Sequence, residues 1–245
     1  MQNNKREDII NFAKQKHFSA LKRKYSLIEP TLPIEPFYTI MLKLEKKERL
    51  DPILVVQLIE ERMLSSDGKI ATAYYRLEAE FYEQEYNRTG NKWDIPRISK
   101  FWRKANEPEQ ALKITNLDLA KIQDNKLKST ILVTRGAAFR DIYKLDDAEN
   151  CAIQAIDYQP NTHQPYTLMG AICYDKGSWE DGYQWFEIAI QLGADTEDID
   201  AEIKQVIRNE KNDDKRREAA EYLLKKDSHR YAWAKDYLKK QKDKK

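Results

Sequence analysis

The sequence is poor in glycine, proline and cysteine for its 245 residues. Seven glycines and eight prolines are too few for a β-rich fold with many tight turns, and they exclude collagen-like and Gly/Ser linker sequences. The two cysteines, Cys151 and Cys173, form no CxxC pair, and no histidines cluster near them. A disulfide framework or a zinc site is therefore not expected. Hydrophobic residues still make up 41% of the chain, which is enough for a packed core.

Long apolar runs are missing as well. No stretch approaches the 18 or so apolar residues that a membrane-spanning helix needs. The first residues, MQNNKREDII, lack the apolar run of a signal peptide. We therefore expect a cytoplasmic protein that has no membrane partner.

Known catalytic and cofactor-binding motifs do not occur. The patterns HExxH, GxGxxG, GxSxG and the phosphate-binding P-loop are absent, and the three histidines are far apart. The acidic residues between Asp195 and Asp200 open a predicted helix, where carboxylates stabilise the N-terminus. We expect no enzymatic activity, no cofactor and no metal.

Charge is unevenly distributed along the chain. The net charge is only +2, yet residues 1–26 carry +5 and residues 225–245 carry +6. The rest of the chain is consequently acidic. Basic ends of this kind can bind a phosphate backbone or an acidic protein surface, but they can equally be solvated terminal helices.

Almost every periodic segment indicates a helix, so the predicted fold is all-α. We expect a basic helix and a proline-rich connector over 1–35, a helical segment over 36–91, and capping helices with a basic tail over 195–245. Short helices separated by brief turns, typical of stacked helical hairpins, follow residue 92. They include helices near 108–121 and 229–241. Whether 36–91 belongs to the same stack is left open.

The hairpins repeat at a spacing of 34 residues. Four features recur: Gly136 as Gly170, Ala148 as Gly182, Ala155 as Ala189, and the acidic pair Asp146-Asp147 as Glu180-Asp181. This pattern of small residues resembles the tetratricopeptide repeat. The resemblance covers 92–194, with good copies at 129–162 and 163–194 and a degenerate copy at 92–125. Small residues are expected to let the two helices of a hairpin approach closely.

The resemblance implies a right-handed α-solenoid whose concave face is lined by the first helix of each hairpin. Positions of these helices that the packing pattern does not use are the candidate partner contacts, with Arg140 and Tyr174 as the leading ones. The full set is Lys100, Arg103, Thr130, Val133, Arg140, Gln164, Thr167 and Tyr174. Val133 and Thr167 stand where arrays that clamp a terminal carboxylate carry Lys and Asn. An extended peptide or a partner helix is therefore the expected ligand.

Two functions compete. The first is a non-catalytic scaffold or adaptor that binds a protein partner. The second is a nucleic-acid-binding accessory protein that uses its basic ends, with the cations Lys22, Arg23, Lys24, Arg230, Lys235, Lys239 and Lys240. Trp233 and Tyr237 are four residues apart, which also suits a capping helix docked by its aromatic face. Because the ends of an incompletely capped solenoid can self-associate, we expect a monomer or a weak homo-oligomer.

Overall fold

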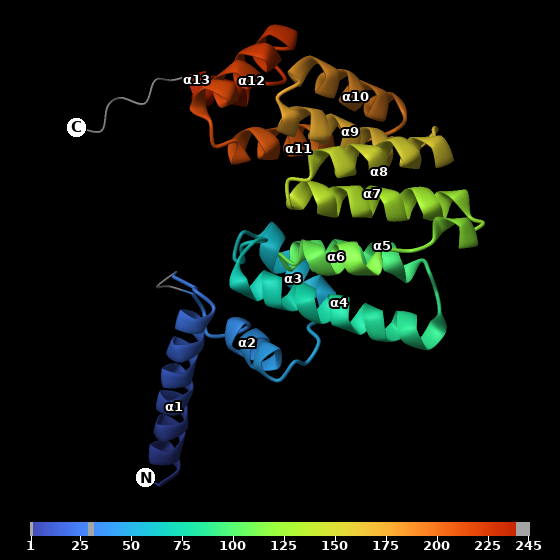
Figure 1. The fold of residues 1–245 in the computed structure, drawn as a ribbon. Helices are drawn as coiled ribbons and strands as arrows, with labels where there is room; N and C mark the ends of the chain where they lie inside the picture. Colours follow the sequence, from blue (N-terminus) through green and yellow to red (C-terminus); the bar gives the residue numbers. More distant parts are fainter. Residues whose placement is uncertain (1, 29–31, 239–245) are drawn as a thin grey trace. The chain divides into compact units, whose positions relative to one another are not determined.

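The computed structural model describes residues 2–28 and 32–238, with side chains from residue 11 onward. Every regular element in these residues is helical, so the predicted all-α fold is confirmed (Figure 1). The chain forms two compact units, Met1–Ile114 and Thr115–Lys245, which are described separately. In the described part of the chain, no helix has both the length and the apolar character needed to cross a membrane.

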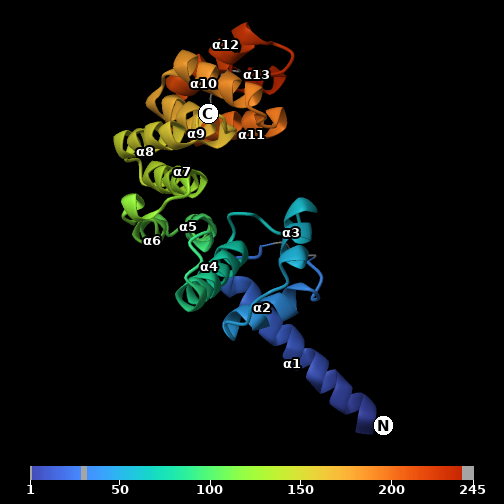
Figure 2. The same ribbon diagram turned by 90° about the vertical axis from the view of Figure 1, so that its right-hand side faces the viewer.

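The first unit contains six helices within its described residues. They are α1 (Gln2–Lys24), α2 (Phe37–Glu45), α3 (Pro52–Glu60), α4 (Lys69–Thr89), α5 (Asp94–Lys104) and α6 (Pro108–Ile114). Helix α4 packs against α5, and α5 packs against α6. Helix α2 contacts both α4 and the C-terminal part of α1, whose other end projects away from the unit (Figure 2).

The core of the first unit contains a buried carboxylate, that of Glu78. Glu78 on α4 is almost completely buried, and Arg49 donates to both of its oxygens, at 2.8 and 2.7 Å. The same guanidinium lies 3.6 Å from the ring centroid of Phe81. This bidentate ion pair compensates the buried negative charge of Glu78, which would otherwise destabilise the core.

The second unit is a stack of helical hairpins. Its elements are η1 (Leu119–Lys121), α7 (Asn125–Asp141), α8 (Leu145–Tyr158), α9 (His163–Lys176), α10 (Trp179–Gln191), α11 (Thr196–Asn209), α12 (Asp213–Lys226), η2 (Ala232–Ala234) and α13 (Lys235–Leu238). Helices α7 and α8 form one hairpin and α9 and α10 the next. Helix α9 also packs against α7, α8 and α11, which joins the hairpins into one stack (Figure 1).

Small residues bring the helices of each hairpin together. A Cβ atom added to Gly136 would lie 3.1 Å from the carbonyl oxygen of Ala148. A Cβ atom added to Gly182 would lie 3.0 Å from the carbonyl oxygen of Gly170. These are equivalent pairs 34 residues apart, so the close approach expected from the sequence is confirmed at both.

The same turn ends the first helix of both hairpins. Tyr143 follows α7 with φ +61°, and Gly177 follows α9 with φ +81°. The turn closes with equivalent hydrogen bonds, from Lys144 N–H to Phe139 O (2.9 Å) and from Ser178 N–H to Cys173 O (2.8 Å). A left-handed residue with this hydrogen bond is a common helix terminus. The repeat is therefore visible in backbone geometry as well as in sequence.

Two predicted helices differ from the structure. The helix expected near 108–121 ends at Ile114, and η1 begins after Asp118, whose side chain accepts a hydrogen bond from Ala120 N–H. The division between the two units thus falls inside the predicted degenerate repeat 92–125.

The second difference lies at the C-terminal end. One helix was predicted near 229–241; the described part of this segment, up to residue 238, instead forms a turn, η2 and the short α13. Asp227 accepts hydrogen bonds from the N–H groups of His229 and Arg230, which fixes the turn. Tyr231 and Ala234 are then fully buried against the core of α11 and α12, as a capping segment requires.

Candidate partner-binding groove

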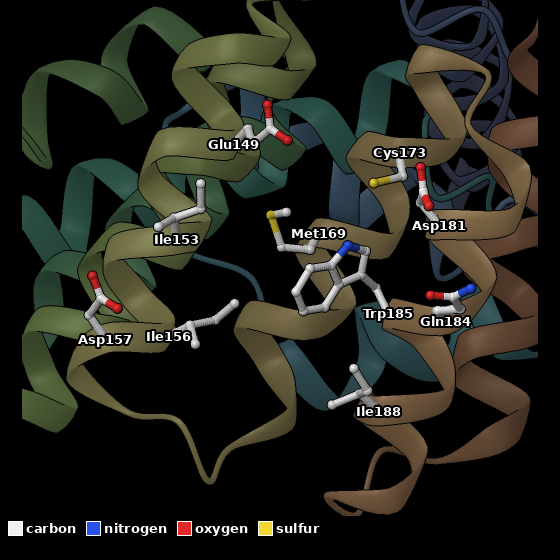
Figure 3. Close-up of a pocket in the computed structure, with 10 residues that line it drawn as sticks. All are labelled: Glu149, Ile153, Ile156, Asp157, Met169, Cys173, Asp181, Gln184, Trp185 and Ile188. Carbon is white, nitrogen blue, oxygen red and sulfur yellow. The ribbon is translucent and has the colours of Figure 1, made fainter.

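An open groove lies between α8 and α10, with α9 as its floor (Figure 3). Its volume is about 620 Å³, and it is open to solvent. Ten side chains line it: Glu149, Ile153, Ile156, Asp157, Met169, Cys173, Asp181, Gln184, Trp185 and Ile188.

Helical periodicity brings these side chains together. Residues three, four or seven positions apart share one face of a helix. Helix α8 contributes Glu149, Ile153, Ile156 and Asp157, and helix α10 contributes Asp181, Gln184, Trp185 and Ile188. Met169 and Cys173, four residues apart on α9, lie between the two walls.

The centre of the groove is apolar. Figure 3 shows the indole of Trp185 beside Met169, with Ile156 and Ile188 on the two walls. Ile153 is 47% exposed, which is high for isoleucine. Fully burying such a side chain stabilises an association by roughly 1.5–3 kcal/mol, so covering the exposed half contributes about 1 kcal/mol.

The rim of the groove is acidic. Glu149 forms an ion pair with Lys176 at 2.7 Å, and the same ammonium contacts Asp146 at 2.8 Å. Asp157 and Asp181 are exposed, and no ion pair to either is formed among the described residues. The groove therefore keeps uncompensated negative charge.

Cys173 is the one nucleophilic side chain among the ten lining residues. Burial raises the pKa of its thiol to about 11, and the charges of Asp181 and Glu149 add to this shift. The thiol is therefore protonated at neutral pH and a poor nucleophile. In the described residues, no group of three or more His, Cys, Asp and Glu side chains could hold a metal ion.

Arg140 is a structural ion-pair residue, contrary to its predicted role as a surface contact. Its side chain on α7 is only 18% exposed and donates to Asp175 on α9 and, at 2.6 Å, to Glu202 on α11. Burial raises the pKa of the Asp175 carboxyl, and Arg140 opposes that shift. Arg140 thus ties α7 and α9, the first helices of the two hairpins, to each other and to α11.

Tyr174 is a core residue, which corrects its prediction as a partner contact. It is 1% exposed, and its ring packs 5.5 Å from Phe186 and 5.4 Å from Trp179, centroid to centroid. Space for the ring exists because Gly182 has no side chain: an added Cβ would run into Tyr174. That glycine was the sequence signal for an inward-facing tyrosine.

The remaining predicted contacts on the first helices are scattered. Thr130 and Thr167 are half-buried and donate to carbonyl oxygens one helical turn back, at 2.7 and 3.1 Å. Val133 packs partly against the core, and Gln164 is exposed. Lys100 and Arg103 belong to α5 in the other unit, where burial and neighbouring cations lower the pKa of Lys100.

Two of the predicted phosphate-binding cations are engaged in ion pairs. Lys24 contacts Glu45 at 2.6 Å. Arg230 contacts Asp200 at 2.7 Å and Glu187 at 3.6 Å, and its side chain is largely buried.

The other predicted cations differ in their surroundings. The Lys22 ammonium lies 5.8 Å from the ring centroid of Phe18, whereas Arg23 and Lys235 are exposed. Lys239 and Lys240 lie outside the described residues. The ring centroids of Trp233 and Tyr237 are 6.1 Å apart, and the Lys204 ammonium lies 5.5 Å from the ring centroid of Trp233. Both rings pack against the core of the second unit, but they come from η2 and α13 and not from the single capping helix that was predicted.

Sequence reasoning did not single out the groove. Ile153, Ile156 and Ile188 follow a helical period that also fits core positions. A scan against models of known protein families found no match to this chain. A search of curated proteins found no relative with significant similarity.

Proposed function

We propose that this protein is a non-catalytic adaptor of the tetratricopeptide-repeat type, whose Thr115–Lys245 unit binds a segment of a partner protein. The 34-residue spacing, the repeated turn at Tyr143 and Gly177, and the paired small residues support the repeat type. The observation that carries the binding function is the open apolar groove, with Ile153 half exposed at its wall.

The groove suits a peptide or helix better than a reacting substrate. Its walls are two helices, and grooves of this kind accept an amphipathic helix through residues spaced along one face. The lining residues include no histidine, serine or lysine, and the Cys173 thiol is protonated at neutral pH. These features favour binding over catalysis.

The proposed site is the groove between second helices, not the face of the first helices. The two leading contacts predicted on the first helices, Arg140 and Tyr174, already serve internal packing. A partner could recruit them only by breaking the ion pairs or the core. The groove offers exposed apolar surface without that cost.

A nucleic-acid-binding function is less well supported. Lys24 and Arg230 each form an ion pair with a carboxylate, which a phosphate backbone would have to displace. Binding through the basic ends remains the competing outcome of the experiment that follows.

The test is affinity purification of the tagged full chain from its own cells, with and without nuclease. Ile153→Gln is compared with Ile53→Gln, because Ile53 is an exposed isoleucine (67%) of the other unit. We expect a stoichiometric protein partner that survives nuclease, is recovered roughly tenfold less with Ile153→Gln and is unaffected by Ile53→Gln. The proposal would be contradicted if the partner is lost on nuclease treatment, or if Ile153→Gln recovers as much partner as the unchanged protein.

A further inference from the structure

We infer that the groove between α8 and α10 accepts an amphipathic helix of a separate partner protein, with lysine or arginine residues flanking its apolar face. This inference rests on the proposed function and specifies the chemistry of the ligand. It follows from the length, the apolar centre and the charge of the groove.

The length of the groove matches two turns of a helix. On α8 the lining residues run from Glu149 to Asp157, about 12 Å along the helix axis at 1.5 Å per residue. On α10 they run from Asp181 to Ile188, about 10 Å. Anchors at positions i, i+3 or i+4, and i+7 of a bound helix span about 10 Å. Such a helix can therefore place three successive anchors in the groove.

The centre of the groove selects apolar anchors. Met169, Trp185 and Ile188 offer no charged atom, and Ile153 stands half exposed at the α8 wall. Burying a polar side chain here without a hydrogen-bond partner would be unfavourable. Large aliphatic or aromatic side chains, by contrast, would lose their contact with water against these residues.

The rim selects basic flanks. Figure 3 shows Asp157 on the α8 side and Asp181 on the α10 side, with the apolar centre between them. Neither carboxylate has an ion-pair partner among the described residues, whereas Glu149 is already paired with Lys176. Lysine or arginine on both edges of a bound helix would complement this charge. An acidic peptide or a nucleic acid would be repelled.

The experiment selects ligands from a displayed library of 16-residue helix-forming peptides, with the full chain as bait. We expect the enriched peptides to carry apolar residues at i, i+3 or i+4, and i+7, and to have a net positive charge. The strongest binder is then measured by fluorescence anisotropy against four variants. These are Ile153→Gln, Ile53→Gln, Asp157→Lys with Asp181→Lys, and Glu218→Lys with Glu221→Lys.

The last pair is the matched control for charge. Glu218 and Glu221 are exposed on α12, outside the groove lining, so their reversal changes the net charge equally. We expect the dissociation constant to rise at least tenfold on reversal of Asp157 and Asp181, and less than threefold in the control. Ile153→Gln is expected to weaken binding about tenfold, and Ile53→Gln to leave it unchanged.

Each contrary result has a distinct meaning. Neutral or acidic binders, or equal effects of the two charge reversals, overturn the basic-helix inference. If Ile153→Gln still abolishes binding in that case, the groove remains the site and the proposed function stands. If no peptide is enriched, or if Ile153→Gln leaves the dissociation constant unchanged, both proposals are wrong.

Self-association is measured separately by sedimentation of the unliganded chain. We expect a monomer at micromolar concentration. Dimerisation that is lost with Ile153→Gln would show that a second copy occupies the groove, and would overturn the assignment to a separate partner.

Discussion

The hairpins α7–α8 and α9–α10 share one backbone frame but fill it differently. Both end their first helix with the same left-handed turn, and both bring their helices together over small residues. When the two hairpins are aligned at the 34-residue spacing, however, Ala148 corresponds to Gly182 and Ala152 to Phe186. The first hairpin is small at both places, whereas the second pairs a glycine with a large aromatic ring.

The difference shows what each kind of residue determines. The small residues allow the two helices of a hairpin to approach closely, and both hairpins show this close approach. The large residues differ in origin: the side chain that packs over the glycine comes from a different helix in each hairpin. Leu168 of the second hairpin packs over Gly136 of the first, whereas Phe186 packs over Gly170 from within its own hairpin. A repeat can therefore keep its frame while its core residues change.

The largest effect is expected from Phe186→Ala, which gives the second hairpin the residue of the first at this position. Phe186 is 1% exposed and contacts both Gly170 and Tyr174. Its removal leaves a cavity, and we expect a loss of about 4 kcal/mol in the free energy of unfolding. Urea unfolding followed by circular dichroism measures it. Phe12→Ala, at an exposed site, should change stability by less than about 0.5 kcal/mol. A loss below about 1 kcal/mol at Phe186 would show that the first hairpin's filling serves equally well in the second.

Arg140→Ala should have the next largest effect, because Arg140 joins both hairpins to α11. Its loss leaves Asp175 buried without a partner, which we expect to cost about 3 kcal/mol at pH 7. Burial already raises the pKa of Asp175, and removing Arg140 raises it further. Protonation at low pH removes the buried charge, so the loss in stability should shrink as the pH falls.

Urea unfolding of this variant at pH 7 and near pH 4.5 checks the sign. The double variant Arg140→Ala with Asp175→Asn should recover a large part of the loss at pH 7, since no charge is then left unpaired. Arg88→Ala is the control, because Arg88 forms only an exposed pair with Glu85. A loss that grows on acidification would contradict this account.

Gly182→Ala introduces into the second hairpin the residue that the first hairpin has at the equivalent position, Ala148. The added Cβ would meet the ring of Tyr174 and would lie 3.0 Å from the backbone oxygen of Gly170. We expect a net loss of about 2 kcal/mol, because overpacking outweighs the higher helix propensity of alanine. Combining it with Tyr174→Leu should recover part of the loss in a double-mutant cycle. A stabilised Gly182→Ala protein would show that the glycine is incidental.

The frame of the hairpins could be predicted from sequence, because it depends on local signals. Gly136 recurs as Gly170 and Ala148 as Gly182, each 34 residues later, and this recurrence of small residues indicates a repeated hairpin. The end of α6 at Ile114 was missed. There the apolar period continues past Ile114, whereas Asp118 caps the start of η1, so the pattern of apolar residues does not show where α6 stops.

The candidate site was harder to predict, because the exposure of a side chain depends on how neighbouring helices pack. Tyr174 faces inward because Gly182 leaves room for it, and Arg140 is held by Glu202, which is 62 residues away. Ile153 obeys the same helical period as a core residue yet stands half exposed. Only the packing of helices α7 to α11 on one another distinguishes these cases.

The smallest effects concern the turn that both hairpins share, where the residue differs but the backbone does not. Gly177 and Tyr143 both adopt positive φ, a conformation that costs most residues about 1 kcal/mol. Gly177→Ala should therefore lower the free energy of unfolding by about 1 kcal/mol. Tyr143→Gly removes that cost of positive φ. It also adds freedom to the unfolded chain and removes the hydrogen bond from the Tyr143 hydroxyl to the Asp175 carbonyl oxygen. Because these effects oppose one another, the free energy of unfolding should change by less than about 0.5 kcal/mol. Thermal and urea unfolding of the two variants measure this asymmetry. Equal losses at both positions would mean that the side chain of Tyr143, rather than the backbone of the turn, stabilises the first hairpin.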